Sequence, residues 1–297
     1  MTLETFCNLC PRKCNALRSD CEPGGFCRSP LLPRIARAAA HFGEEPCIAG
    51  SAGTGAVFFT GCSLRCVFCQ NKDISRGEGG EAVSVQKLRQ IILSLEDSGV
   101  DSIDLVTGTH YIPAIAEALG GLRLSVPVVW NSSGYESIEG LRMLEGLVQV
   151  YMPDFKYYRA APAKKYSLAQ DYPGIASAAI KEMFRQVGAY ELDEKGLMKK
   201  GVLIRHLIMP GLEDDAMDII DFAADEFPRG SVLFSLMSQY TPIDGLEGFP
   251  ELQRRIDAES NERLIHYMKA RHLDGFWQET AAAGEEMIPD FDGTGVI

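Results

Sequence analysis

Three cysteines lie close together in residues 61–71, directly after an apolar run: Cys62, Cys66 and Cys69. Thiolates at this spacing on one loop can surround a metal centre, and iron–sulfur clusters are held by cysteine thiolates. Three thiolates on a four-iron cluster leave one iron free to bind another molecule. A structural zinc site would need a fourth ligand nearby to close its tetrahedron. The spacing therefore favours an iron–sulfur cluster with an open iron over structural zinc or buried free thiols.

Five more cysteines precede this loop within residues 7–27, together with the turn-forming sequence Pro-Gly-Gly. The expected ligands are Cys7, Cys10, Cys14 and Cys27, with Cys21 as a further ligand or a free thiol. Four thiolates close either a zinc site or an iron–sulfur cluster, and the spacing does not choose between them. Because a segment this short has little core of its own, a bound metal would supply much of its folding energy.

The spacing Cys-x3-Cys-x2-Cys, with Phe68 before the last cysteine, resembles the signature of the radical S-adenosylmethionine (SAM) enzymes. The resemblance implies that Cys62, Cys66 and Cys69 hold a [4Fe-4S] cluster whose open iron binds SAM. It also implies that the reduced cluster cleaves SAM to methionine and a 5′-deoxyadenosyl radical, which abstracts a hydrogen atom. An electron donor of the flavodoxin or ferredoxin type is then an expected partner.

The elements that must position these cysteines form an alternating pattern. Short β-branched apolar runs alternate with amphipathic segments, as parallel βαβ units do. We expect strands at residues 57–60, 103–107, 126–130, 148–154, 202–208 and 232–237, and helices starting near residues 84, 112, 137, 160, 213 and 260. Six such units predict an α/β fold, a partial (β/α)6 barrel that resembles the radical SAM core.

Two further predictions concern the ends of this pattern. Residues 1–50 are expected to form a Cys-rich metal-binding extension and linker, and residues 51–297 the radical SAM core. The alanine-rich residues 34–40 predict a short helix, and residues 193–196 predict the turn of a hairpin. His41 and Cys47 are interpreted as structural residues rather than further metal ligands.

Polar residues follow the predicted strands at their carboxyl ends, where barrels of this kind carry their chemistry. Six consecutive strands with this property predict one ligand site. The candidate cofactor-binding residues are Phe68, Gly108, Thr109, Asn131, Ser132, Ser133, Asp154, Lys156 and Arg205, and the candidate catalytic or substrate-facing residues are His110, His206 and Tyr240.

The chemistry of SAM suggests a role for several of these residues. Lys156 and Arg205 are cations that can meet its carboxylate, Arg205 through two hydrogen bonds. A backbone carbonyl beside Gly108 can approach the ammonium closely, because glycine lacks a Cβ. Short polar side chains suit the ribose diol or a bound cation, and three lie together, Asn131, Ser132 and Ser133.

A closer resemblance covers roughly residues 55–240. The segments Asn-Ser-Ser-Gly-Tyr, Met-Pro-Asp-Phe-Lys and Ile-Arg-His-Leu-Ile-Met-Pro-Gly resemble, in order and spacing, those of the pyruvate formate-lyase activating enzymes. The likeness implies that Asp154 and Lys156 help to hold SAM, and that Asn131 and Ser132 lie at a monovalent cation site. The N-terminal cysteine element resembles that of the poorly characterised activating-enzyme-like radical SAM proteins.

Composition excludes several other classes. The 297 residues are 46% hydrophobic and 24% charged, as in a soluble globular protein. A net charge of −12 disfavours general nucleic-acid binding, which depends on neutralising phosphates. No apolar run reaches the length of a membrane span, and the N-terminus lacks the pattern of a signal peptide. We therefore expect a cytoplasmic protein with neither a membrane nor a nucleic acid as partner.

Three functions remain to be compared. The first is a radical SAM enzyme that acts on a small molecule or a peptide, which we favour. The second is an activating enzyme that generates a glycyl radical on a pyruvate formate-lyase-like partner. The third is a non-catalytic iron–sulfur or zinc protein, which the polar strand ends disfavour.

Overall fold

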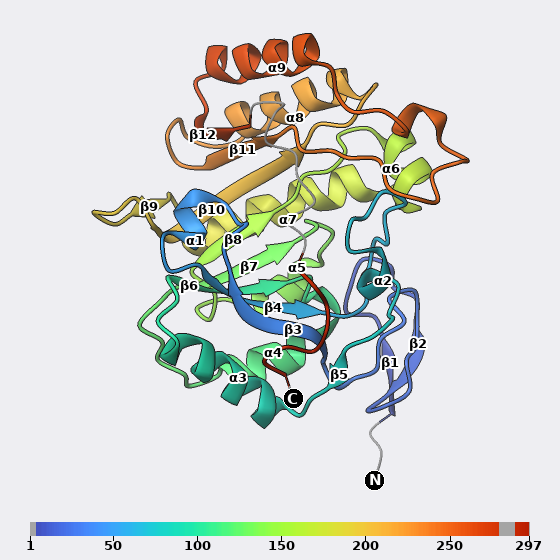
Figure 1. Cartoon of the computed structure of the whole chain (residues 1–297), viewed down its shortest axis with the longest axis vertical. Helices are drawn as coiled ribbons and strands as arrows, with labels where there is room; N and C mark the ends of the chain where they lie inside the picture. Colours follow the sequence, from blue (N-terminus) through green and yellow to red (C-terminus); the bar gives the residue numbers. More distant parts are fainter. Residues whose placement is uncertain (1–3, 279–288, 297) are drawn as a thin grey trace.

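The centre of the molecule is a mostly parallel sheet (Figure 1). The computed structural model describes residues 4–278 and 289–296. Within these residues the sheet order is β12-β11-β10-β8-β7-β6-β4-β3-β5, with β9 beside β10. Its six central parallel strands are β4 (Thr54–Phe59), β6 (Ser102–Val106), β7 (Val128–Ser132), β8 (Val150–Pro153), β10 (Met198–Leu207) and β11 (Leu233–Met237). The predicted α/β fold with six parallel units is confirmed.

Helices connect these strands and cover the outer face of the sheet. They are α3 (Val85–Asp97), α4 (Ile112–Leu119), α5 (Ile138–Arg142), α6 (Ala160–Ser167), α7 (Tyr172–Val187), α8 (Glu213–Asp225) and α9 (Ala258–Ala270). The hydroxyls of Ser84 and Ser137 accept hydrogen bonds from the backbone N–H of Lys87 and Gly140, as N-cap residues do. Helix α3 buries Leu88, Ile91, Ile92 and Leu95, one face of a 3.6-residue period.

The alanine-rich residues 34–40 do not form the predicted helix. They lie in strand β3 (Arg34–His41), which pairs antiparallel with β4 and with the short β5 (Glu81–Ala82). Helix propensity is a weak preference, and ladder hydrogen bonds to β4 outweigh it here. Residues 293–296 pass beside the same strand, where Ala38 N–H donates to the Thr294 carbonyl at 2.9 Å.

Several short elements lie around the central strands. The N-terminal hairpin consists of β1 (Glu4–Cys7) and β2 (Ala16–Ser19), and α1 (Pro46–Ala49) and α2 (Lys72–Ser75) follow β3 and the cysteine loop. Strand β9 (Glu191–Leu192) forms the predicted hairpin with β10. Strand β12 (Asp274–Trp277), which the sequence did not predict, adds a parallel edge next to β11. The division into two parts at residue 50 stays a prediction.

Nothing in the described ranges, 4–278 and 289–296, is a helix long and apolar enough to cross a membrane.

Candidate active site

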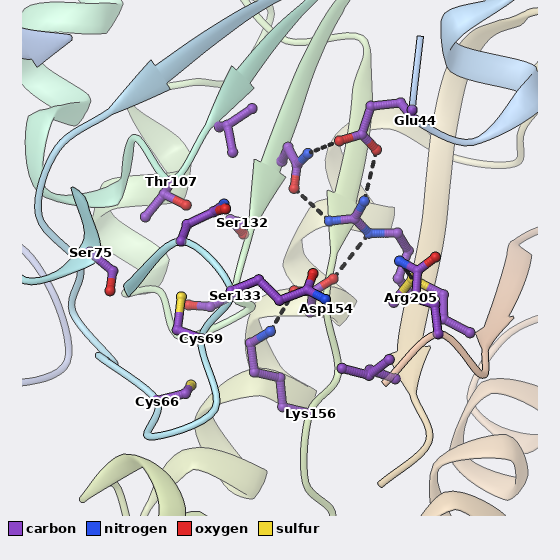
Figure 2. Close-up of a pocket in the computed structure, with 18 of the residues that line it drawn as sticks. Glu44, Cys66, Cys69, Ser75, Thr107, Ser132, Ser133, Asp154, Lys156 and Arg205 are labelled. Atoms are coloured by element: carbon purple, nitrogen blue, oxygen red, sulfur yellow. Dashed lines mark hydrogen bonds and ion pairs between the residues drawn. The ribbon is translucent and has the colours of Figure 1, made fainter. Parts of the chain in front are cut away.

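One cavity of about 760 Å³ lies at the carboxyl ends of the parallel strands. Residues from near both edges of the sheet line it, from His41 at the end of β3 to Trp277 in β12, so the sheet curves around this space. Figure 2 shows the side chains of Ser132 on β7, Asp154 just after β8 and Arg205 on β10 lining it, opposite the cysteine loop. The cavity is thus the place where the predicted site residues can meet one ligand.

Cys62, Cys66 and Cys69 all line the cavity from the loop that follows β4. Burial raises the pKa of the Cys62 thiol, and burial raises that of Cys69 to about 12. Two donors already face the sulfurs. The Leu64 N–H lies 3.3 Å from Cys62 Sγ, and the Ser167 hydroxyl lies 2.9 Å from Cys66 Sγ. Hydrogen bonds of this kind stabilise thiolate, the form that binds metal.

The three thiols match the kind of ligand that holds an iron–sulfur cluster. Among residues 4–278 and 289–296, no three Cys, His, Asp or Glu side chains already converge as ligands of one metal ion. Thiolates on a cubane each bind a different iron, so they do not need to converge on one point. A metal also reverses the raised thiol pKa, because a coordinating thiol is deprotonated.

A buried charge network lies opposite the cysteines. Lys156 Nζ is 2.6 Å from Asp154 Oδ2, and Arg205 Nε donates to Asp154 Oδ1 at 3.0 Å. Burial alone would raise the pKa of Asp154, but the charges of Lys156 and Arg205 hold it below its ordinary value. The carboxylate therefore stays ionised between two cations, and Lys156 faces the cysteine loop (Figure 2).

Arg205 connects this pair to a second carboxylate. Its Nη1 donates to Glu44 Oε2 at 2.8 Å and its Nη2 to Asn131 Oδ1 at 2.7 Å. The Asn131 amide donates in turn to Glu44 and to buried Asp104, whose pKa burial raises well above its usual value. The Asn131 oxygen accepts one hydrogen bond from a guanidinium, and the cation site expected at this residue stays a prediction.

The structure brings eight of the other predicted residues to the same cavity. Ser132 and Ser133 lie between the cysteine loop and Asp154 (Figure 2). Phe68 and Tyr240 pack edge to face with ring centroids 6.2 Å apart, and the Tyr240 hydroxyl donates to the Leu252 carbonyl. The eight are Phe68, Asn131, Ser132, Ser133, Asp154, Lys156, Arg205 and Tyr240.

Four predicted residues do not line the cavity. After β6, Thr107 lines the cavity in place of the predicted Gly108 and Thr109. Thr107 has a φ of 61°, in the left-handed region. Gly108 faces Ile115 and Trp130, and the Thr109 hydroxyl donates to Glu136. His110 and His206 are buried, with a ring nitrogen 2.8 Å from the Thr60 and the Phe155 carbonyl respectively. The geometry gives these two histidines a structural environment.

Several lining residues were missed by sequence reasoning. Glu44 and Glu45 lie in the short connection between β3 and α1, and no spacing or motif marked them. The Ser235 hydroxyl donates to Glu45, whose pKa burial raises. Trp277 lines the cavity from β12 and remains 44% exposed. These residues line the cavity from elements other than the cysteine loop.

The upstream cysteines form a separate group outside the cavity. Thiolate charge on Cys27, Cys7 and Cys14 adds to burial in raising the pKa of Cys10 to about 11, so these four thiols are neighbours. Gly25 has a φ of 72°, and a Cβ there would lie 2.9 Å from Cys14 Sγ, so only glycine leaves room for this thiol. Cys21 is exposed. The grouping matches the predicted ligand set, which stays a prediction.

Two arginines join the two cysteine regions. Arg12, between Cys10 and Cys14, donates to the Ser63 and Ser167 carbonyls, each at 2.7 Å. In the opposite direction, Arg65 from the cysteine loop donates to the Phe26 carbonyl at 3.1 Å. Both guanidinium groups lie over the Phe26 ring, at 3.9 and 5.1 Å from its centroid. We call this arrangement the Arg12–Phe26–Arg65 contact.

Comparison with known proteins points to one family. The sequence model of the Radical SAM superfamily matches residues 56–223, which contain Cys62, Cys66 and Cys69. An uncharacterized protein of Methanocaldococcus jannaschii is 30% identical over 278 residues, covering 90% of this chain and 75% of that protein. The anaerobic ribonucleoside-triphosphate reductase-activating protein of Enterobacteria phage T4 is 26% identical over 116 residues, 37% of this chain and 74% of that protein.

A solved structure shares the fold. The radical SAM methyltransferase from Sphaerobacter thermophilus aligns with a TM-score of 0.53 at 13% identity, over 75% of this chain and 66% of that chain. The superfamily implies a [4Fe-4S] cluster and SAM, and the cavity holds the three thiols on one side and the buried charges on the other. On the strength of the matched residues, the chain belongs to the radical SAM superfamily.

Proposed function

We propose that this protein reductively cleaves SAM and uses the resulting 5′-deoxyadenosyl radical to abstract hydrogen from a small molecule or a peptide. The observation that carries the proposal is the single cavity that Cys62, Cys66 and Cys69 share with Lys156 and the other polar strand ends. When bound, a [4Fe-4S] cluster supplies the electron that breaks a carbon–sulfur bond of SAM. The protein's own residues bind and orient the reactants.

The residues divide by position around the cavity. Cys62, Cys66 and Cys69 would hold the cluster, and Lys156 is the cation that faces this loop and can bind the carboxylate of SAM. Asp154 keeps Lys156 charged and in place through their 2.6 Å contact. The hydroxyls of Ser132 and Ser133 are suited to a ribose diol.

The remaining wall would face the substrate. Glu44, Glu45 and Trp277 line the cavity on elements other than the cysteine loop, and Arg205 lies between Glu44 and Asp154. Carboxylates and a guanidinium together suit a substrate with polar groups, as small metabolites and peptides have. Burial of these groups strengthens each interaction with such a substrate.

The proposal includes a second metal site at the upstream thiols. Cys7, Cys10, Cys14 and Cys27 would hold either zinc or an iron–sulfur cluster, because four cysteine thiolates are a ligand set of both. They precede the residues that match the superfamily, so this site is an addition to the core.

The test is SAM cleavage by protein reconstituted anaerobically with iron and sulfide. With dithionite and SAM, the protein should release 5′-deoxyadenosine, and Cys62→Ala should abolish the release. Cys21→Ala is the matched control, because Cys21 is exposed and outside the cavity, and it should retain activity. No release by the unmodified protein would overturn the proposal, and full release by Cys62→Ala would overturn the ligand assignment.

A second candidate function is the activation of a glycyl-radical enzyme. It is favoured by the similarity to the reductase-activating protein of phage T4, which includes 37% of this chain. An activating enzyme should generate a glycyl-radical EPR signal on a large partner protein. Deuterium transfer from a labelled small molecule into 5′-deoxyadenosine, without such a partner, would instead support the first function.

A further inference from the structure

Five arginines gather on the outer side of the cysteine loop, away from the cavity. Arg12 and Arg65 stack on the same Phe26 ring. Arg28 and Arg34 meet at the turn after Arg76. A Cβ on Gly77 would lie 3.0 Å from Arg28 Cβ, and Arg34 Nη1 donates to the Gly77 carbonyl at 3.3 Å. We call Arg12, Arg28, Arg34, Arg65 and Arg76 the arginine surface.

The arginine surface is unusual for this molecule. Residues 1–40 and 61–80, which contain it, have nine Lys and Arg against five Asp and Glu, whereas the whole chain has a net charge of −12. Arg28 and Arg76 are exposed, and none of the five forms an ion pair with a residue that the structure describes.

The arginine surface lies next to both cysteine regions. Arg65 lies in the cluster loop between Cys62 and Cys66, and Arg12 and Arg28 neighbour Cys10 and Cys27 of the upstream group. Arg65 Nε is buried without a hydrogen-bond partner among the described residues. Hairpin β1–β2 and helix α2 lie on the same flank of the molecule (Figure 1). A protein bound on this side would approach both cysteine sites while leaving the cavity open.

We infer that the arginine surface docks an acidic one-electron carrier protein that reduces the cluster held by Cys62, Cys66 and Cys69. The inference rests on the proposed function, because only a redox cluster needs such a partner. One electron leaves the reduced carrier, which is oxidised, and the cluster is reduced. Clustered positive charge on an acidic protein steers an acidic partner to one place, since charge complementarity sets orientation and association rate.

The first test measures binding without catalysis. Oxidised flavodoxin, an acidic carrier, is titrated into the full-length reconstituted protein at low and at physiological ionic strength. The double variant Arg28→Glu/Arg76→Glu should bind at least about tenfold more weakly than the unmodified protein, and added salt should reduce the difference. The control Arg123→Glu/Arg229→Glu makes the same change in net charge at exposed positions elsewhere and should bind within about twofold of the unmodified protein.

The second test separates this inference from the proposed function. Arg28→Glu/Arg76→Glu should cleave SAM normally with dithionite and slowly with reduced flavodoxin. If dithionite fails with the unmodified protein, the proposed function is wrong, while the binding result still tests the surface. The inference is wrong if both double variants lose flavodoxin binding equally, or if neither of them loses it. It is also wrong if the protein binds single-stranded DNA more tightly than flavodoxin. A thermal melt shows whether Arg28→Glu/Arg76→Glu folds. If it does not fold, Arg28→Gln/Arg76→Gln is used in its place.

Discussion

Lys156 is held by one carboxylate and faces the cysteine loop. Its ammonium lies 2.6 Å from Asp154 Oδ2, and Arg205 binds the other oxygen of the same carboxylate at 3.0 Å. Arg205 is also bound by Glu44, so its charge is already shared between two carboxylates. Lys156 therefore has more capacity than Arg205 to bind an additional anion, although the sequence marked both equally as cations.

Lys156→Ala should weaken SAM binding by about 10- to 100-fold, the value of one charge-assisted hydrogen bond. Equilibrium dialysis with labelled SAM on the reconstituted protein measures this. Lys165→Ala is the matched control, because Lys165 pairs with Glu251 at the surface, where such pairs contribute little. Equal affinity in Lys156→Ala and the unmodified protein would remove Lys156 from the SAM site.

His206 should make the fold sensitive to acid. Burial lowers its pKa from 6.5 to about 4, so the unfolded chain binds its proton at a higher pH than the folded protein does. The stability that neutral His206 contributes is therefore fully present above about pH 6.5 and is lost as the pH falls toward 4. At pH 5 this one histidine lowers the free energy of unfolding by about 2 kcal/mol relative to neutral pH.

His206→Gln should keep a donor for the Phe155 carbonyl and remove the titration. Urea unfolding at pH 7.5 and pH 5 should show a smaller loss of stability in the variant than in the unmodified protein. His266→Gln is the control, on the surface helix α9. If the loss between the two pH values is the same in all three proteins, His206 does not carry this proton.

At the scale of elements, strand β12 depends on one glycine. A Cβ on Gly275 would lie 1.9 Å from the Phe234 carbonyl oxygen of β11, and its φ is 143°. The neighbouring residues Phe276 and Trp277 line the cavity, so this close pairing also closes one side of the site. No other residue type permits the two strands to approach in this way.

Gly275→Ala should separate β12 from β11 and lower the free energy of unfolding by more than about 2 kcal/mol. Gly174→Ala, at an open position in helix α7, should instead stabilise the protein by up to about 1 kcal/mol. Chemical denaturation of both variants measures the difference. Similar stability of the two would show that β12 adjusts to a side chain.

The upstream cysteines make a prediction about metal content. Cys10→Ser and Cys27→Ser should each lose the metal of the upstream site, because both thiols are buried beside Cys7 and Cys14. Cys21→Ser should retain it, since Cys21 is exposed. Iron and zinc analysis of the full-length proteins provides the measurement and distinguishes the two metals. Loss of metal from Cys21→Ser would add Cys21 to the ligands.

At the scale of the whole molecule, the regular part of the fold could be predicted from the sequence. The strand predictions at 103–107 and 232–237 fall within a residue of β6 and β11, because buried parallel strands are continuous apolar runs. Residues 34–40 were misassigned because alanine favours a helix locally, and only pairing with β4 decides otherwise. Glu44 and Thr107 were missed because loop direction depends on tertiary contacts, which no spacing encodes.

The Arg12–Phe26–Arg65 contact has a consequence for the order in which the chain folds. Arg12 reaches a carbonyl 51 residues away and another 155 residues away, so these bonds close large loops. Contacts between distant residues form late, because the entropy of loop closure must be overcome first. The central strands should therefore be paired before the cysteine loop is fixed.

Hydrogen-exchange pulse labelling during refolding can follow this order. The Val67 amide, which donates to the Tyr166 carbonyl at 2.9 Å, should become protected after the amides that join β6 to β7. Simultaneous protection would contradict the expected order. A loop that closes last keeps its thiols open to solvent while the barrel is already formed, so iron can be delivered to a folded protein rather than to a nascent chain.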